Sequence, residues 1–443
     1  MLLNQVSGEF QARRHALMQS HAHTAVILPG AVELTRNAST TFPFRQDSSF
    51  YYLTGFEEPD AILVLVPWVG SPSKTRRFRS VAFVRKRDAE REIWEGEHYG
   101  VERVREIFGF DETYPIDEFE SRLAGLLSDS EKVFYALNQP RGLDRVVLPA
   151  IEKATKARMR SSHLPMSIHH PATLVGEMRL LKSLSEIENM RRAAQISAET
   201  HTEVMKVVRP GMTEFDVETM LEYGFKRRGC KRSAYDSIVA GGKNATCLHY
   251  RFNNEELRDG DLLLIDAAGE IGLYAADITR TYPVGKKFTP VQARVYDIVL
   301  RAQKAGIELA KPGSTIEDVH RQCVDVLVDG LIELGLLKGK RTDLVQSGAY
   351  RRFYMHNTSH WLGLDVHDSG AYREASGSRK LLAGSVITVE PGLYMQHEDQ
   401  TIPAEYRGIG IRIEDDVLIT ESGNEVMSRA APKEREEVEA LRA

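Results

Sequence analysis

An eight-residue segment in the second half of the chain recurs further along, and this repeat constrains the fold most strongly. Residues 210–217 read Pro-Gly-Met-Thr-Glu-Phe-Asp-Val and residues 312–319 read Pro-Gly-Ser-Thr-Ile-Glu-Asp-Val, identical at five of eight positions. In each copy Pro-Gly would end one helix and Thr would cap the next. Further on, residues 260–266 and 384–390 each place a turn before an apolar strand that ends in a carboxylate. Two matches in the same order predict a duplicated helix–helix–sheet unit.

The first part of the chain has a different pattern. The whole chain has 443 residues, which at roughly 150 residues per domain leaves room for more than one domain. A helical pattern covers residues 7–19, and short apolar runs typical of buried strands follow at 25–28, 61–66, 81–84 and 133–136. A new long amphipathic helix begins near Ser183. We therefore predict an α+β protein of two domains: residues 1–175, with a mixed sheet flanked by helices, and residues 176–443, with the repeat.

The composition limits the partners and the location. The chain carries 58 Lys and Arg against 63 Asp and Glu, a net charge of −5, and this slight acidity argues against nucleic acid as the main partner. No apolar run approaches the ~18 residues needed to cross a membrane. The first residues, Met1–Ser7, lack the regions of a signal peptide, and three scattered cysteines fit a reducing compartment. We therefore expect a cytoplasmic protein with neither a membrane nor a nucleic acid partner.

Four carboxylates stand in or beside strongly apolar strands. Asp266 follows Leu262-Leu-Leu-Ile265, and Asp277 precedes Ile278-Thr-Arg-Thr-Tyr282; with two glycines between them, the pair reads as a β-hairpin. In the second half, Glu390 follows the apolar residues 386–389, and Glu414 lies inside the apolar stretch 409–419. Burying an unpaired charge costs several kcal/mol. Each carboxylate therefore needs either exposure at a strand end or a partner.

Pairing with arginine is the simple explanation for any single one of these carboxylates, and Arg280 and Arg412 are available for it. Four carboxylates at matching positions of two related halves are harder to explain in this way. If the halves pack about a pseudo-two-fold axis, the strands bring the four together, and their repulsion would be severe unless cations neutralised it. A pair of bound divalent metal ions is the simplest such neutraliser.

Histidines supply the missing type of ligand. His356, His360 and His367 fall within twelve residues, and His249 lies at the matching place in the first half. Such a cluster either binds and catalyses or simply forms hydrogen bonds within loops. A set rich in oxygen ligands with one imidazole suits Mn²⁺, and could also take Co²⁺, Fe²⁺ or Zn²⁺. With two metals activating a bridging water, and with histidines around them, the residues predict a hydrolase of an amide or ester.

The order of these carboxylates and histidines, and the short strings around them, resemble those of a known family. The order Asp266, Asp277, His360, Glu390, Glu414 is similar to the metal-ligand set of the pita-bread metallopeptidases, which include methionine aminopeptidase, prolidase and aminopeptidase P. The local strings that carry the resemblance are Ile265-Asp-Ala, Ala276-Asp-Ile-Thr-Arg-Thr281, Ser359-His-Trp-Leu-Gly363, Val366-His-Asp368, Val389-Glu-Pro-Gly392 and Gly410-Ile-Arg-Ile-Glu-Asp415. Residues 44–60 are similar to the N-terminal domain of bacterial Xaa-Pro aminopeptidases. The resemblance therefore covers essentially the whole chain.

The resemblance implies a pita-bread fold for the second domain, with a pseudo-two-fold internal repeat, and a role for each ligand. Asp266 would hold one metal, and His360 and Glu390 the other. Asp277 and Glu414 would bridge the two. Glu390 would also accept the proton of the bridging water, which is the nucleophile. Two divalent metal ions, with Mn²⁺ as the expected metal, are thus the implied cofactor.

Other residues match positions around the metals. By the same resemblance, His249 and His367 would contact the scissile peptide and stabilise the tetrahedral intermediate, and His356 would line the site on the proline side. Arg412 and Tyr394 would steady the carboxylates, which makes the arginine pairing considered above compatible with catalysis.

The implied activity is that of an aminopeptidase that cleaves the bond before a penultimate proline, on peptide substrates. Prolidase, which cuts Xaa-Pro dipeptides, is the alternative, because it shares the two-domain layout and all five ligands. The methionine-removing enzymes mostly lack an N-terminal domain, and binding scaffolds and creatinase-like relatives have lost the metal set. Trp94 matches a tryptophan that the bacterial enzymes lend to a neighbouring subunit, although a lone tryptophan also occurs in cores and interfaces. A homodimer or homotetramer is therefore expected.

Overall fold

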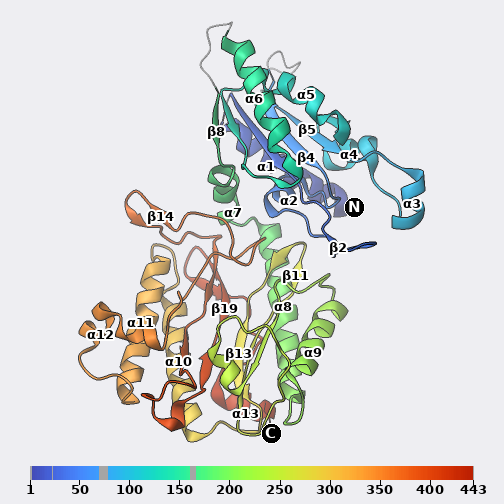
Figure 1. The fold of residues 1–443 in the computed structure, drawn as a ribbon. Coiled ribbons are helices and arrows are strands. Elements are labelled where there is room, and N and C mark those ends of the chain that lie inside the picture. Colours follow the sequence, from blue (N-terminus) through green and yellow to red (C-terminus); the bar gives the residue numbers. More distant parts are fainter. Residues whose placement is uncertain (1, 22, 69–77, 160–165, 443) are drawn as a thin grey trace. The chain divides into compact units, whose positions relative to one another are not determined.

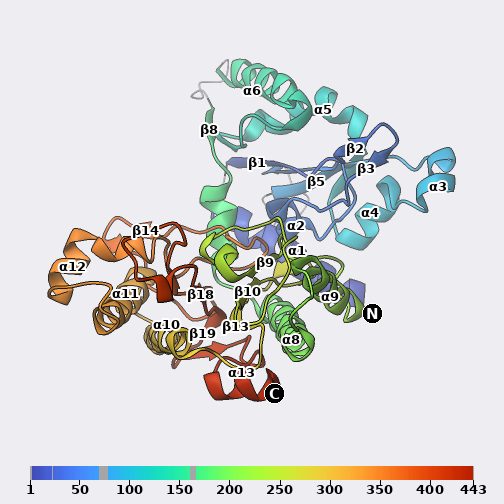
Figure 2. The ribbon, with the colours of Figure 1, turned by 60° about the horizontal axis from the view of Figure 1, so that its bottom comes forward.

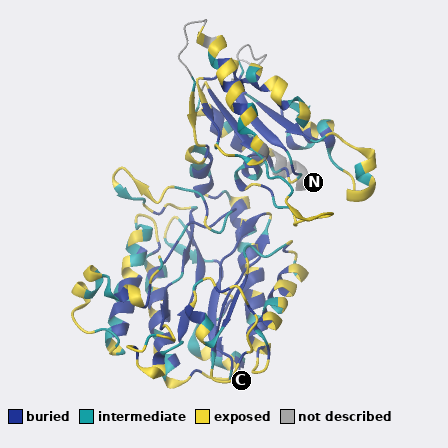
Figure 3. Cartoon of the chain, in the orientation of Figure 1, coloured by how far each residue is buried: buried dark blue, intermediate teal, exposed yellow. Residues whose placement is uncertain are grey.

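The computed structural model describes residues 2–21, 23–68, 78–159 and 166–442. The chain divides into two compact units, Met1–Met178 and Arg179–Ala443. The sequence places this boundary near residue 175, three residues earlier. No helix of the described residues is long and apolar enough to cross a membrane. Figure 3 shows that in each unit the central strands are buried while the outer faces of the helices are exposed.

Unit 1 is built on a six-stranded mixed sheet of order β6-β5-β4-β1-β7-β8 (Figure 1). Strand β1 pairs antiparallel with β4 and parallel with β7, so the predicted mixed sheet is confirmed. The strands are β1 (Thr24–Pro29), β4 (Ile62–Pro67), β5 (Phe78–Val84), β6 (Glu112–Pro115), β7 (Lys132–Phe134) and β8 (Ser167–His169). The sequence predicts β1, β4, β5 and β7 from their apolar runs. The edge strands β6 and β8 have no buried residue, and therefore no such signal.

Helices flank this sheet. They are α1 (Leu2–Gln19), α2 (Ser48–Thr54), α3 (Ala89–Glu95), α4 (Gly100–Phe108), α5 (Phe119–Leu126) and α6 (Asp144–Met159), and α7 (Glu177–Leu180) spans the boundary between the units. Alternate strand residues such as Ile27, Val64 and Phe83 pack with α5 and α6 in one apolar cluster. A short hairpin, β2 (Thr35–Asn37) and β3 (Thr40–Thr41), projects from the chain after β1.

Unit 2 contains the repeat, and each copy begins a helix in the same way. Thr213 caps α9 (Glu214–Arg227) and Thr315 caps α11 (Ile316–Glu333), each in a capping box with the Asp three residues on. The other helices are α8 (Leu184–Val207), α10 (Pro290–Leu309), α12 (Arg341–Ser347) and α13 (Arg435–Arg442). The pairs α8–α9 and α10–α11 pack together, and the strands lie between the two pairs (Figures 1 and 2).

The strands of unit 2 form small antiparallel sheets. One has the order β13-β10-β9 and another the order β16-β19-β20. Their strands are β9 (Ile238–Gly241), β10 (Leu262–Asp266), β13 (Thr279–Pro283), β16 (Val386–Val389), β19 (Asp415–Ile419) and β20 (Asn424–Val426). Two-stranded pairs are formed by β17 (Gly392–Tyr394) with β18 (Gly410–Arg412), β11 (Glu270–Ile271) with β12 (Tyr274–Ala275), and β14 (Arg373–Glu374) with β15 (Gly377–Ser378).

Candidate metal centre

Side chains predicted for the site line one cavity of about 360 Å³ in unit 2. They come from both halves of the repeat and are Asp266, Asp277, His249, His356, His360, His367, Glu390, Arg412 and Glu414. Tyr394 is not among the residues that line the cavity; it is fully buried and accepts a hydrogen bond from Arg412. Trp94 lies in unit 1, on α3, and is 88% exposed.

Strand ends place the four carboxylates. Asp266 is the last residue of β10, opposite Thr279 of β13, and Asp277 stands just before β13. Glu390 directly follows β16. The apolar stretch 409–419 is not a single strand, because β18 ends at Arg412 and β19 starts at Asp415. Glu414 lies in this break, where its backbone N–H donates to the carbonyl of Thr279, 3.1 Å away.

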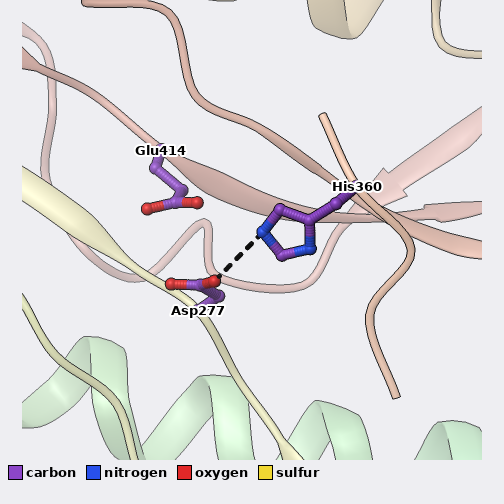
Figure 4. A group of neighbouring side chains, drawn as sticks. All are labelled: Asp277, His360 and Glu414. Carbon is purple, nitrogen blue, oxygen red and sulfur yellow. Dashed lines mark ion pairs between the residues drawn. The ribbon is translucent and has the colours of Figure 1, made fainter. Parts of the chain in front are cut away.

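Asp277, His360 and Glu414 form the tightest group. Each offers one ligand atom, and these atoms lie within 4.8 Å of one another. Figure 4 shows the three side chains pointing toward one another from different segments. His360 Nε2 is 3.4 Å from Asp277 Oδ2 and 3.7 Å from Glu390 Oε1. The His360 Nδ1 atom is 3.0 Å from its neighbour's carbonyl, at Trp361, which leaves Nε2 to face the carboxylates.

A tyrosine that the sequence does not single out joins two of the carboxylates. The Tyr235 hydroxyl lies 2.6 Å from Asp266 Oδ1 and 2.7 Å from Asp277 Oδ1. Its single proton is therefore shared between two acceptors. Arg412 donates to the other oxygen of Asp266, Oδ2, at 2.6 Å. Asp266 is thus oriented from both sides.

Arg412 also extends a chain of hydrogen bonds along the cavity wall. Its Nε donates to Thr279 Oγ1 at 3.0 Å, and Thr279 Oγ1 donates to Glu414 Oε2 at 2.6 Å. Its Nη1 donates to the Tyr394 hydroxyl at 3.1 Å, and this hydroxyl lies 2.8 Å from His356 Nε2. Arg412 therefore orients a carboxylate from each half of the repeat and, through Tyr394, one imidazole.

The carboxylates carry more negative charge than the protein groups neutralise. Burial, followed by repulsion from Asp277 and Glu390, raises the pKa of Glu414 well above its ordinary value. Burial also raises the pKa of Glu390 to about 7 and raises that of Asp266, although Arg412 lowers both. A cation among these oxygens would relieve the repulsion and restore the ionised forms. The donor set of carboxylates with one imidazole fits a hard divalent metal such as Mn²⁺.

The histidines differ in their proton affinity. Burial would lower the pKa of His360, but Asp277 and Glu390 outweigh it and raise this pKa to about 9. A cation would displace that proton, since a metal-binding imidazole is neutral. Burial and the nearby Arg412 lower the pKa of His356 to about 3, and burial and His360 lower that of His367. His356 and His367 are therefore neutral near pH 7 and can each donate one hydrogen bond.

A further carboxylate lies beneath the centre. Asp416 accepts the backbone N–H of Asp277 at 3.1 and 3.2 Å, and burial and Asp277 raise its pKa well above the ordinary value. Its neighbour Asp415 pairs with the buried Arg280 at 2.7 Å. Arg280, which the sequence offers as a partner for the four carboxylates, is therefore engaged by another one. Arg412, in contrast, does contact Asp266.

Comparison with known proteins finds a matching family for each of the two units. The sequence pattern of metallopeptidase family M24 matches residues 188–421, and that of the aminopeptidase P N-terminal domain matches residues 10–135. The Xaa-Pro aminopeptidase of Escherichia coli strain K12 is 44% identical over 98% of this chain and 97% of its own length. Proline aminopeptidase P II from Yersinia pestis superposes with a TM-score of 0.92 at 44% identity, over 98% of this chain and 99% of that chain. Zinc-substituted E. coli aminopeptidase P in complex with product also has a TM-score of 0.92, at 43% identity over 98% of both chains.

Proposed function

Because the chain belongs to metallopeptidase family M24, we infer that it is an aminopeptidase that hydrolyses the bond between the N-terminal residue of a peptide and a proline in second position. The observation that carries this conclusion is the extent of the similarity: it includes the aminopeptidase P N-terminal domain as well as the M24 unit. An M24 unit alone would be compatible with several peptidases of the family. The prediction from the residues, hydrolysis of an amide or ester, agrees with this conclusion.

The cavity supports a dinuclear centre. We propose that Asp266 would hold one divalent cation and His360 and Glu390 the other, that Asp277 and Glu414 would be shared between the two, and that Mn²⁺ is the metal used. When bound, the cations polarise water and stabilise the negative charge that develops on the scissile carbonyl oxygen. The buried, mutually repelling carboxylates support this assignment, because they lack a sufficient protein countercharge.

The protein groups around the centre then have distinct tasks. Glu390, on the cavity wall, accepts a proton from the attacking water, because bound cations would keep its carboxylate ionised and able to take that proton. His367 and His249, both on the cavity wall, donate to the substrate carbonyl and stabilise the tetrahedral intermediate. His356, held by the Tyr394 hydroxyl, lines the side that receives proline. Arg412 keeps Asp266 in place through its 2.6 Å contact.

Prolidase activity is the alternative. The length of the peptide that is cleaved distinguishes an aminopeptidase from a prolidase. With Mn²⁺, the purified protein is expected to release Arg from Arg-Pro-Pro and to cleave the dipeptide Gly-Pro much more slowly, by about a hundredfold in kcat/KM. The release of the first residue is measured by chromatography. Arg-Ala-Pro is the matched control and should be a poor substrate. Cleavage of the dipeptide alone would contradict the aminopeptidase assignment.

We further propose that the active form is a homodimer or homotetramer in which Trp94 reaches the site of a neighbouring subunit. Trp94 and its neighbour Ile93 are 88% and 81% exposed on α3, which is unusual for such large apolar side chains. Trp94→Ala is expected to lower kcat/KM on Arg-Pro-Pro about tenfold, with the same metal content. Ile93→Ala removes similar exposed apolar surface and serves as the control. Full activity of Trp94→Ala would argue against this role. So would full activity of a protein that analytical ultracentrifugation shows to be a monomer.

Two broader features complete the proposal. The matching helix caps at Thr213 and Thr315, and the three-stranded sheet in each half, support a duplication with pseudo-two-fold symmetry inside the pita-bread unit. Cys230, Cys247 and Cys323 carry free thiols, which supports a reducing location such as the cytoplasm.

A further inference from the structure

Glu214, the first residue of α9, has an unusual environment for a glutamate in the first turn of a helix. Its side chain is completely buried. Oε1 accepts hydrogen bonds from the backbone N–H of Gly241 at 2.7 Å and from Asn244 Nδ2 at 3.0 Å. Oε2 accepts from the Tyr250 hydroxyl at 2.8 Å and from the backbone N–H of Glu255 at 3.0 Å. A carboxylate has about four acceptor sites, so this one is fully used.

The four donors all belong to one loop and are spread over its whole length. Gly241 stands at its start and Glu255 at its end, while Asn244 and Tyr250 lie inside it. Of the described residues between Gly241 and Glu255, only Gly242–Thr246 form a helical turn. Fixed geometry in the rest of the loop therefore depends on contacts such as those with Glu214. His249, which lines the active-site cavity, directly precedes Tyr250 in this loop.

Helix capping does not explain the position of this carboxylate. Thr213 and Asp216 form the capping box of α9, with the Asp216 carboxylate accepting the backbone N–H of Thr213 at 2.8 Å. The matching position of the second repeat is Ile316, at the start of α11. A helix of this kind therefore begins without a glutamate there. Burying a carboxylate is costly unless it is fully hydrogen-bonded, so a specific role for Glu214 is indicated.

We propose that Glu214 is a positioning residue for catalysis: it closes the loop 241–255 around its carboxylate and so holds His249 at the cavity wall. The proposal rests on the assignment of His249 to the substrate carbonyl. Gly241 belongs to the same arrangement, because a Cβ there would lie 2.7 Å from Leu257 Cδ2 and 3.4 Å from Glu214 Oε1. A Cβ at this position would touch the carboxylate at an ordinary contact distance and would require the Leu257 side chain to shift.

Glu214→Gln tests the proposal with little change in shape. Each carboxylate oxygen accepts one backbone N–H, from Gly241 or from Glu255. Whichever way the glutamine amide is turned, its NH₂ group therefore faces a backbone donor that cannot reverse, and one end of the loop is released. We expect kcat/KM on Arg-Pro-Pro to fall by about ten- to a hundredfold, with bound Mn²⁺ unchanged. Asp216→Asn, in the same helix turn but outside the loop, should stay within about twofold of the wild type.

A double-mutant cycle with His249→Ala gives the decisive readout. If Glu214 acts through His249, Glu214→Gln should cost less than about twofold once His249 is already alanine. The same fold loss in both backgrounds would overturn the proposal, since Glu214 would then act on stability or on another group. An unchanged kcat/KM for His249→Ala alone would instead refute the assigned role of His249. Tyr250→Phe removes one donor and leaves the carboxylate, so it provides a milder variant if Glu214→Gln folds poorly, with a smaller loss that must also vanish without His249.

Discussion

Asp277→Asn is expected to abolish peptidase activity while leaving the chain folded. Asp277 lies next to three other side chains of the centre. Tyr235 lies 2.7 Å from one of its oxygens, His360 lies 3.4 Å from the other, and Glu414 completes the group. Asparagine keeps the shape, but it removes one negative charge and turns an acceptor into a donor. We expect kcat/KM on Arg-Pro-Pro to fall at least about a thousandfold, or ~4 kcal/mol of transition-state stabilisation.

The same substitution should change metal binding and stability in opposite directions. Bound Mn²⁺, measured by atomic emission after dialysis, is expected to decrease because a shared ligand is lost. The metal-free variant should melt at a higher temperature than the metal-free wild type, since repulsion from Asp277 is one cause of the raised pKa of Glu414. Asp329→Asn, which affects an exposed carboxylate that pairs with Arg341, is the control and should keep full activity. Substantial turnover by Asp277→Asn at full metal content would contradict the bridging role.

The four carboxylates could be predicted from the sequence because a charge inside an apolar strand stands out. Asp266 and Glu390 end apolar strands as expected. The break at Glu414 could not be predicted, because the apolar pattern continues across it, while in the folded chain the backbone N–H of Glu414 donates to the carbonyl of Thr279 in the other half. Whether these residues hold metal stays a prediction, which the variants above test.

Apart from Arg412 and Tyr394, the residues that orient groups of the site had no comparable signal. Tyr235 lies outside any strand or helix, and its link between Asp266 and Asp277 exists only in the folded chain. Thr279 has an ordinary strand position, and its bond to Glu414 crosses 135 residues of sequence. Glu214 fits the pattern of an exposed helix start, and its burial follows from a loop that packs over α9. Partners supplied by distant segments are therefore the part of the site that local pattern cannot supply.

Removing the metal is expected to make stability depend on pH in a specific window. In the metal-free protein the pKa of Glu390 is raised to about 7, that of His360 to about 9, and those of Glu414 and Asp416 well above their ordinary values. Each of these groups binds its proton more tightly in the folded chain than in the unfolded one. Stability is therefore present at low pH and is lost as the pH rises through the folded-state pKa.

Between about pH 6.5 and about pH 8.5, the groups with a raised pKa set most of the pH dependence of stability. The pKa values of His356, His367, His201 and His320 are lowered by burial, to about 3 for His356 and about 4 for His201. Such groups favour folding as the pH rises, but only below the ordinary histidine pKa of about 6.5. Their contribution fades within about one pH unit above it, and beyond that the slope is set by the raised groups at about 1.4 kcal/mol per pH unit for each extra proton held by the folded chain.

Bound Mn²⁺ should remove the part of this slope that comes from its ligands, because it keeps Glu390 and Glu414 ionised and His360 neutral in the folded protein. Thermal unfolding at several pH values, with EDTA and with Mn²⁺, measures both cases. We expect the melting temperature in EDTA to fall as the pH rises from about 6.5 to about 8.5, and the stabilisation by Mn²⁺ to grow over the same range. A stabilisation by Mn²⁺ that stays constant across this range would mean that metal binding releases no proton, and that the buried carboxylates are not its ligands.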